Sequence, residues 1–159
     1  TFFKAGGKSS LQTYLPLLSG LPNTLLVHNT FTSREDIEFA ATVHSRLFWC
    51  LCPNANLYIE NRLPDVHLLR DAGLTITLGT DSLASNHQLS ILAEMLTLQE
   101  KEGVPFTELL RWATLNGAVF LGIDQQYGSF EAGKKPGINL IGRMDGELLT
   151  AQSYIQRLI

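Results

Sequence analysis

The first candidate for chemistry in this sequence is an acidic residue that closely follows an apolar segment. Asp81 comes just after residues 74–78 (L-T-I-T-L), which read as a buried strand. A carboxylate at the end of a buried strand costs free energy unless a partner satisfies it, and metal ions and hydrogen-bonded substrates are the usual partners. The alternative interpretation is an aspartate that caps the next helix or stabilises a turn. Asp81 is therefore a candidate site residue, with a structural role as its competitor.

Two further strand ends precede Asp81 along the chain. His28 ends a short apolar strand expected at 24–28, and Cys52 ends a second strand expected at 46–52. Helical segments separate these strands, and such alternation predicts an α/β fold with a parallel sheet. The chain contains neither a G-x-G-x-x-G motif nor a P-loop, so a segment of a β/α barrel is favoured over a nucleotide-binding fold. In β/α barrels the catalytic groups sit at the carboxyl ends of the strands.

Capping and helix-breaking residues set the limits of the flanking helices. We expect helices at 9–18 (shortened or kinked by Pro16), from a cap at 32–35 to 43, at 66–72, at 87–102, from 105 onward, and at 114–121. Beyond Gly122, a glycine-rich connection leads to short strands expected at 138–141 and 153–159. We therefore expect two units: residues 1–122 as part of a barrel, and residues 123–159 as the connection and C-terminal strands of a flanking β domain.

Composition excludes several classes of protein. The chain has 159 residues, of which 45% are hydrophobic and 17% charged, as in a well-buried globular protein. The net charge of −3 provides no basic footprint for nucleic acid. No stretch reaches the roughly 18 apolar residues of a membrane span. Cys50 and Cys52 lie on one face of a strand, and C-x-C is a poor match to zinc-ribbon or redox spacing. We interpret them as small buried residues of a cytoplasmic protein.

Four motifs, taken together, resemble a known family. They are L-L-V-H-N-T at 25–30, C-P-N-A-N-L at 52–57, G-T-D-S-L-A-S-N at 79–86, and A-T-L-N-G-A at 113–118 followed by L-G at 121–122. Their order and spacing resemble the amidohydrolase superfamily, and more closely its chlorohydrolase and aminohydrolase branch, which includes guanine, adenosylhomocysteine and aminodeoxyfutalosine deaminases. The resemblance covers residues 24–141 and places this chain at strands six to eight of a (β/α)8 TIM barrel, followed by the end of a small β domain.

The resemblance implies specific roles for five residues. Asp81 would be the eighth-strand metal ligand and the general base that takes a proton from the metal-bound water. His28 would be the sixth-strand histidine, which orients the water or polarises the substrate in one-metal members and binds the second metal in two-metal members. Asn56, Ser85 and Asn86 would contact substrate or support the residues that do.

This residue set suits hydrolysis. A bound metal lowers the pKa of water toward neutrality, and zinc prefers histidine nitrogen and aspartate oxygen with one position left open. An adjacent aspartate can relay a proton to a leaving amine. The resemblance therefore implies a divalent metal, zinc or iron, and an enzyme that deaminates a heterocyclic amine through a metal-bound hydroxide. We expect a small-molecule substrate, no nucleic-acid or membrane partner, and a homo-oligomer.

Several departures from the family pattern limit this interpretation. None of the four histidines forms an H-x-H pair, so the first- and fifth-strand ligands are expected outside this chain. Thr1 would follow the fifth strand directly, and the chain alone is expected to be an inactive fragment. Leu51 stands where many relatives have histidine, which removes a possible substrate contact and leaves the substrate less defined. Ala55 replaces the usual serine. A binuclear cyclic amidohydrolase and a non-catalytic barrel relative that binds a small molecule remain the alternatives.

Other polar and aromatic residues are weaker candidates. We expect His87 to be a surface or cap residue at the start of a helix, His44 and His67 to be structural or exposed within helices, Asn29 and Asn54 to line a pocket, and Trp49 and Trp112 to lie in the core.

Overall fold

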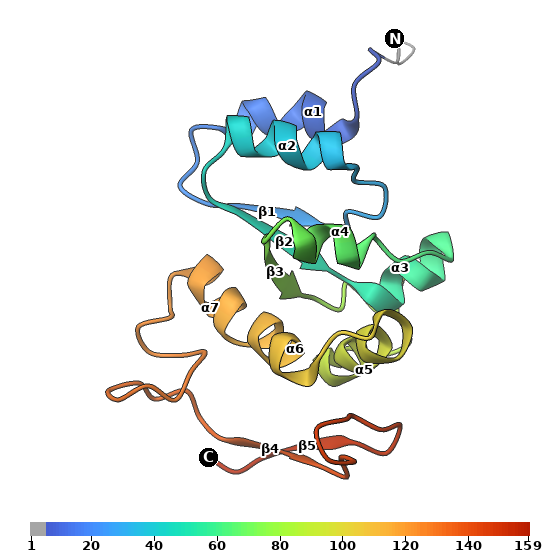
Figure 1. Cartoon of the computed structure of the whole chain (residues 1–159). Helices are drawn as coiled ribbons and strands as arrows, with labels where there is room; N and C mark the ends of the chain where they lie inside the picture. Colours follow the sequence, from blue (N-terminus) through green and yellow to red (C-terminus); the bar gives the residue numbers. More distant parts are fainter. Residues whose placement is uncertain (1–5) are drawn as a thin grey trace.

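Three parallel strands organise the first 122 residues (Figure 1). The computed structural model describes residues 6–159; the expectation that the chain starts just after a fifth strand concerns residues 1–5, outside this range. The strands are β1 (Thr24–Val27), β2 (Leu47–Leu51) and β3 (Thr75–Leu78), in the spatial order β1-β2-β3. Both pairings are parallel. The predicted α/β class with a parallel sheet is therefore confirmed.

Helices connect and flank the strands. They are α1 (Ser10–Tyr14), the 3-10 helix η1 (Leu15–Leu18), α2 (Arg34–Val43), α3 (Pro53–Glu60), α4 (Val66–Asp71), α5 (Ile91–Glu102), α6 (Phe106–Ala113) and α7 (Leu115–Leu121). Helices α1 and α2 pack together on the β1 side, whereas α6 and α7 contact β3 on the opposite side (Figure 1). None of the helices within residues 6–159 combines the length and apolar character needed to cross a membrane.

Polar side chains set where the first helices begin. Ser33 and Asp36 form a capping box, in which the Ser33 hydroxyl accepts the Asp36 N–H at 3.2 Å and the Asp36 carboxylate accepts the Ser33 N–H at 3.1 Å. Ser9, the cap of α1, also donates to Asp36 at 2.5 Å and so joins α1 to α2. Burial alone would raise the pKa of Asp36, but these hydrogen bonds outweigh it and lower the pKa. As predicted, the α-helix stops before Pro16 and continues as η1.

Two predicted boundaries differ from the structure. Helix α3 follows β2 directly, where the sequence suggested only the end of a strand; Pro53 takes the first helical position, at which a missing N–H costs nothing. The long helix predicted from His87 begins instead at Ile91, because the Ser90 side chain accepts the Ala93 N–H at 3.3 Å and caps the helix there. His87 therefore lies in the β3–α5 loop, exposed, and not at the start of a helix.

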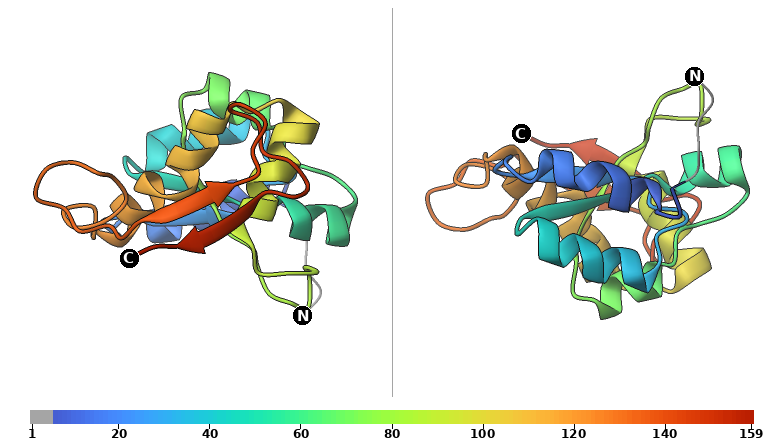
Figure 2. Two further views of the ribbon diagram at one scale, coloured as in Figure 1. Left: turned by 90° about the horizontal axis from the view of Figure 1, so that it is seen from below. Right: turned by 90° about the horizontal axis from the view of Figure 1, so that it is seen from above.

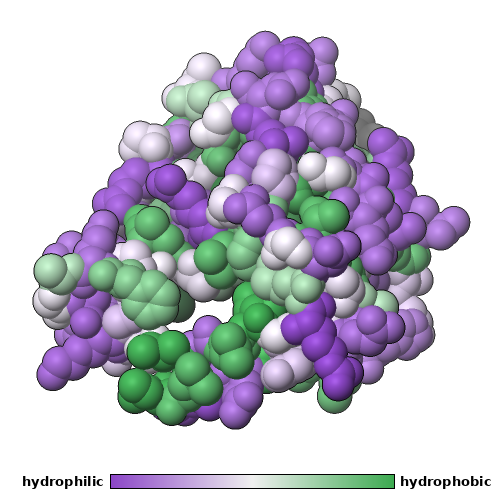
Figure 3. Space-filling view, turned by 60° about the horizontal axis from the view of Figure 1, so that its bottom comes forward, coloured by the Kyte–Doolittle hydropathy of each residue, from purple (hydrophilic) through white to green (hydrophobic). Residues whose placement is uncertain are grey.

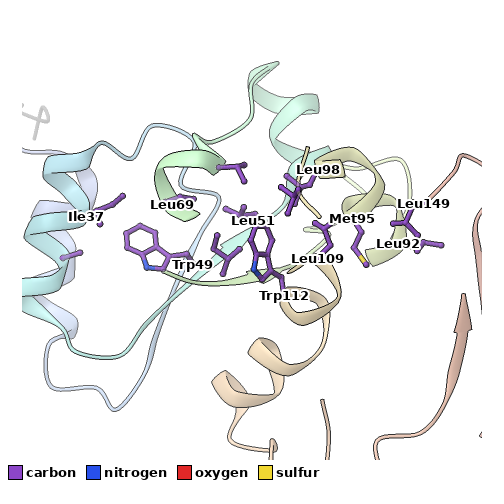
Figure 4. Packing of buried hydrophobic residues seen from close by; sticks show 14 of the residues in the cluster. Ile37, Trp49, Leu51, Leu69, Leu92, Met95, Leu98, Leu109, Trp112 and Leu149 are labelled. Carbon is purple, nitrogen blue, oxygen red and sulfur yellow. The ribbon is translucent and has the colours of Figure 1, made fainter. Parts of the chain in front are cut away.

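The main core lies on the helix-covered side of the sheet. Trp49 and Leu51, two residues apart on β2, point to the same face and pack with Ile76 of β3 against the surrounding helices (Figure 4). Trp112 of α6 joins the same cluster, so both tryptophans lie in the core as predicted. Burial of such large side chains is the dominant stabilising term of the fold, at about 1.5–3 kcal/mol for each fully buried large aliphatic side chain.

Near the carboxyl end of β2, the opposite face of the sheet carries smaller side chains. Cys50 and Cys52 are buried free thiols that cluster with Ala55 and the half-buried Leu25. Their common face and burial were predicted from the C-x-C spacing. The A-T-L-N-G-A motif is also structural in this part of the chain, because the buried Asn116 donates to the Ile76 carbonyl oxygen at 2.7 Å and fastens α7 to β3.

The C-terminal part contains an antiparallel pair, β4 (Asn139–Gly142) and β5 (Tyr154–Arg157), which confirms the two predicted short strands. Figure 2 shows this pair running across the helices at one end of the molecule. Several hydrophobic residues of this part stay exposed, among them Phe130, Leu140, Ile155 and Ile159. Figure 3 shows hydrophobic surface on the face turned toward that end of the molecule.

Candidate functional site

The carboxyl ends of the three strands meet at one edge of the sheet. Ladder hydrogen bonds extend one residue past the strands: the His28 N–H donates to the Cys50 carbonyl and the Gly79 N–H to the Leu51 carbonyl, both at 2.9 Å. Neighbouring strands lie about 4.8 Å apart, so the ends of β1 and β3 are roughly 10 Å apart across β2. His28 and Asp81, predicted from the sequence as site residues, are therefore at the same edge.

The backbone at this edge is unusual. Among residues 6–159 five non-glycine residues have a positive φ angle, and three of them are His28 (71°), Asn29 (61°) and Asp81 (56°). A left-handed conformation costs an L-residue about 1–2 kcal/mol, although asparagine and aspartate tolerate it better than most. Backbone strain that the surrounding structure maintains is concentrated at functional sites. Both candidate site residues thus lie where the chain leaves its strand in a strained turn.

Gly79 brings the Asp81 loop close to the two thiols of β2. A Cβ atom at this position would lie 3.0 Å from Cys50 Sγ and 3.3 Å from Cys52 Sγ. Only glycine therefore fits without displacing a buried sulfur atom. This close contact explains the glycine of the G-T-D motif on packing grounds alone.

A residue of its own loop holds the Asp81 side chain, and Asp81 remains exposed to solvent. Ser85, predicted as a site residue, donates its hydroxyl to Asp81 Oδ2 at 2.5 Å and is itself buried. Within residues 6–159 the other carboxylate oxygen, Oδ1, accepts no hydrogen bond. Asp81 does not cap a helix, because Ser90 caps the helix that follows. One carboxylate oxygen is thus fixed while the other is free for a ligand.

His28 lies beside two buried polar side chains. Asn56 of α3, 1% exposed, places its Nδ2 atom 2.7 Å from Thr30 Oγ1 and 3.4 Å from His28 Nδ1. Its Oδ1 atom is buried without a hydrogen-bond partner among the described residues. A buried acceptor left unpaired costs about 1–3 kcal/mol, which a bound water or ligand would recover. Thr30 was not predicted; it is part of the same L-L-V-H-N-T motif as His28.

Asn86 connects the Asp81 loop to a residue that the sequence analysis missed. Its Nδ2 atom donates to the Thr80 carbonyl at 2.8 Å and to Glu94 Oε1 at 2.7 Å. Glu94 lies in α5, and its Oε2 atom accepts the Asn54 backbone N–H at 2.8 Å. The available signal was a glutamate on the buried stripe of a helix, between Leu92 and Leu98. An ionisable group at such a position is rarely buried without a purpose.

Within residues 6–159 the remaining candidates make no hydrogen bond to Asp81. Asn29 helps to line a hollow of about 360 Å³ between α1 and β1, and the lining of this hollow does not include Asp81. Asn54 joins the Glu94 group instead of lining a pocket, with its side-chain oxygen accepting from Thr97 at 2.7 Å. His44 is buried just after α2, while His67 is exposed on α4. Residues 6–159 hold no cluster of three or more His, Cys, Asp or Glu side chains arranged for a metal ion.

Comparison with known proteins identifies the family. The chain is 30% identical to the 5-methylthioadenosine/S-adenosylhomocysteine deaminase of Teredinibacter turnerae, over 98% of the chain and 37% of that protein. Its structure is similar to that of Helicobacter pylori aminofutalosine deaminase in complex with methylthio-coformycin, with a TM-score of 0.69, 27% identity, and 88% and 34% of the two chains covered.

A second solved structure is a zinc-bound adenosine deaminase from Xanthomonas campestris, with a TM-score of 0.62, 28% identity, and 71% and 27% of the two chains covered. The chain therefore spans between about a quarter and a little over a third of the length of these relatives. The family model described as the amidohydrolase family matches residues 3–153. The resemblance seen in the four motifs is confirmed, and the chain belongs to the amidohydrolase family.

Proposed function

We propose that the protein carrying this chain is a metal-dependent enzyme that deaminates a heterocyclic amine by hydrolysing a C–N bond. In this proposal residues 1–122 supply strands six to eight of a β/α barrel, and residues 123–159 supply the end of a flanking β domain. The first- and fifth-strand histidines would come from the rest of the protein. The named relatives include deaminases of adenosine and of S-adenosylhomocysteine, which supports an aminopurine group in the substrate.

One observation carries the proposal. The carboxyl ends of two parallel strands present an accessible carboxylate, Asp81, and an imidazole, His28, from left-handed backbone positions. The carboxyl edge is where β/α folds place catalytic groups. A helix-capping role does not apply to Asp81, because Ser90 caps the helix that follows, and a turn role alone would not require an exposed carboxylate oxygen at this edge.

The types of donor atom at this edge suit a divalent metal. Zinc takes aspartate oxygen and histidine nitrogen, and Asp81 Oδ1 and the His28 ring are such donors. A bound metal would supply Lewis acidity that brings the pKa of water toward neutrality. Asp81 would hold the metal, and His28 would either orient water and substrate or serve as a ligand to a second ion.

The residues around Asp81 suit proton transfer. The Ser85 hydroxyl donates to Asp81 Oδ2 and so holds the whole carboxylate in a defined orientation, as a general base requires. Asp81 would take a proton from the attacking water and return it to the leaving amine. Asn56, with its unpaired buried oxygen next to His28, would accept a hydrogen bond from substrate or from an ordered water.

The decisive test is the metal content of the full-length protein, measured by elemental analysis for the wild type, Asp81→Asn and a matched surface variant, Asp71→Asn. We expect about one equivalent of zinc or iron in the wild type and in Asp71→Asn, and a reduced content in Asp81→Asn. Two equivalents would favour the binuclear alternative, with His28 as a ligand. No metal after reconstitution would overturn the proposal and favour a non-catalytic relative.

A further inference from the structure

Glu94 is a buried carboxylate that lies between the start of α3 and the loop that carries Asp81. It sits on the first turn of α5 and is 0% exposed. Its Oε2 atom accepts the Asn54 N–H at the start of α3, which follows β2. Its Oε1 atom accepts from Asn86, which belongs to the loop after β3. A single side chain therefore joins the first turn of the helix that follows β2 to the loop that follows β3.

The two donors explain how this charge is tolerated. None of the ion pairs within residues 6–159 involves Glu94, so no cation offsets the cost of its burial. That burial raises its pKa, while the hydrogen bonds from Asn54 and Asn86 counteract the rise. Both carboxylate oxygens accept an N–H, which is the arrangement that an ionised carboxylate requires.

The contact reaches Asp81 through one amide group. The Asn86 side chain has two N–H hydrogens; one points to Glu94 and the other to the carbonyl of Thr80, the residue before Asp81. The carboxylate, an acceptor only, dictates that the NH₂ side of Asn86 faces inward. This orientation in turn holds the Thr80–Asp81 peptide in the conformation that gives Asp81 its positive φ angle.

We propose that Glu94 is a positioning residue, which acts through Asn86 to fix the backbone that carries Asp81. The inference rests on the proposed function of Asp81, to which it adds a residue without contact to substrate. Outer partners of metal-binding residues typically contribute about 10- to 100-fold to metal affinity or activity.

Glu94→Gln is the sharpest substitution because it preserves shape. Glutamine has one acceptor oxygen and one NH₂ group, so it cannot accept from both Asn54 and Asn86. If its oxygen stays with Asn54, its NH₂ group faces that of Asn86 and forces the Asn86 amide to turn over. The Thr80 carbonyl then loses its donor. Glu100→Gln is the matched control, since Glu100 lies on the same helix and is exposed.

The experiment uses the full-length protein and two kinds of readout. Hydrogen exchange at the backbone amides of 80–86, followed by mass spectrometry, reports the order of the loop whether or not the enzyme is active. Deamination kinetics with adenosine as the probe substrate report the chemistry. We expect Glu94→Gln to accelerate exchange in 80–86 about tenfold and to lower kcat about 10- to 100-fold at unchanged KM. Glu100→Gln should change neither quantity.

A double-mutant cycle separates positioning from general loss of stability. If Glu94 acts through Asn86, then Asn86→Ala already removes the connection, and Glu94→Gln adds little to it. Additive losses in the double variant would overturn the inference, as would unchanged exchange in Glu94→Gln. If Glu94→Gln does not fold, Asn86→Ala alone must still accelerate exchange in 80–86. Absence of metal and activity in the wild type would overturn the proposed function and leave the exchange test of Glu94 in force.

Discussion

The two ends of the parallel sheet each carry a histidine, and the fold uses them differently. At the amino end, His44 is buried; its Nδ1 accepts the Arg46 N–H and its Nε2 lies near Thr24 Oγ1, each at 3.1 Å. At the carboxyl end, His28 is half-buried, and among residues 6–159 its ring has one long polar contact, 3.4 Å from Asn56 Nδ2. Both nitrogens of His44 are used by the fold, whereas most of the hydrogen-bonding capacity of His28 stays available.

The backbone shows the same contrast. The Thr24 N–H extends the regular parallel ladder by donating to the Arg46 carbonyl at 3.2 Å, and no residue from 24 to 27 or 44 to 51 has a positive φ angle. Just beyond the carboxyl ends, His28, Asn29 and Asp81 all adopt the left-handed conformation. The amino end of the sheet is thus built for stability, while the carboxyl end holds polar groups on a strained backbone with few hydrogen-bond partners.

The largest expected effect is the loss of turnover in Asp81→Asn. An asparagine tolerates the left-handed backbone but removes the charge and the basic oxygen, so the fold should persist. We expect kcat/KM of the full-length protein to fall about 10²- to 10⁴-fold. Steady-state kinetics with Asp71→Asn as control provide the measurement, with circular dichroism as the check on folding. Retained activity would remove Asp81 from the proposed mechanism.

His28→Asn should come next. Asparagine again suits the positive φ angle, so stability should change little, whereas loss of the imidazole should lower kcat about 10²-fold. Comparison of kcat with the unfolding midpoint in urea separates the two quantities. A variant that is destabilised but fully active when folded would make His28 a structural residue like His44 and erase the contrast between the two ends.

His44→Ala should give the opposite pattern. It leaves the buried Thr24 hydroxyl and the Arg46 N–H without their partner, which costs about 1–3 kcal/mol of unfolding free energy. Activity per folded molecule should equal that of the wild type. Urea unfolding combined with kinetics at low temperature provides the measurement. A loss of kcat without loss of stability would contradict the assignment.

The smallest effect concerns pH and the buried charge at the carboxyl end. The folded state raises the pKa of Glu94 above its ordinary value of 4.5, so it binds a proton more tightly than the unfolded chain does. The contribution of this group to stability is therefore largest below pH 4.5 and falls as pH rises through the folded pKa. As the pH is raised from 4 to 7, the melting temperature of Glu94→Gln, measured by calorimetry, should therefore increase relative to that of the wild type. A difference in melting temperature that stays constant with pH, as expected for Glu100→Gln, would contradict this prediction.

Much of this arrangement could be predicted from local patterns. The strand ends at His28 and Asp81 follow from apolar runs, and Ser33, Pro16 and Gly122 mark helix limits through their backbone chemistry alone. The start of α5 could not be fixed, because Ser90 competes with several polar residues upstream and only the folded loop shows which one caps the helix.

Long-range polar contacts were beyond sequence reasoning. Glu94 and Asn54 are 40 residues apart, and nothing local indicates that a carboxylate on one helix accepts a backbone N–H from the first turn of another. The left-handed angles of His28 and Asp81 could not be predicted either, because this conformation is uncommon for any non-glycine residue even though histidine and aspartate are enriched in it. The motifs thus predicted the candidate residues, and the structure shows which contacts hold them.

Helix α5 connects two distant parts of the chain at once. Near its start Glu94 joins the start of α3 to the loop that carries Asp81, and about one and a half turns later the Gln99 amide pairs with both backbone groups of Leu149, N–H and carbonyl, at 2.9 Å each. Leu149 lies between β4 and β5 and is buried. Helix α5 therefore contacts both the Asp81 loop and the C-terminal part of the chain. A truncation that removes the C-terminal strands would also remove both Gln99–Leu149 hydrogen bonds, and with them a support of the helix that carries Glu94.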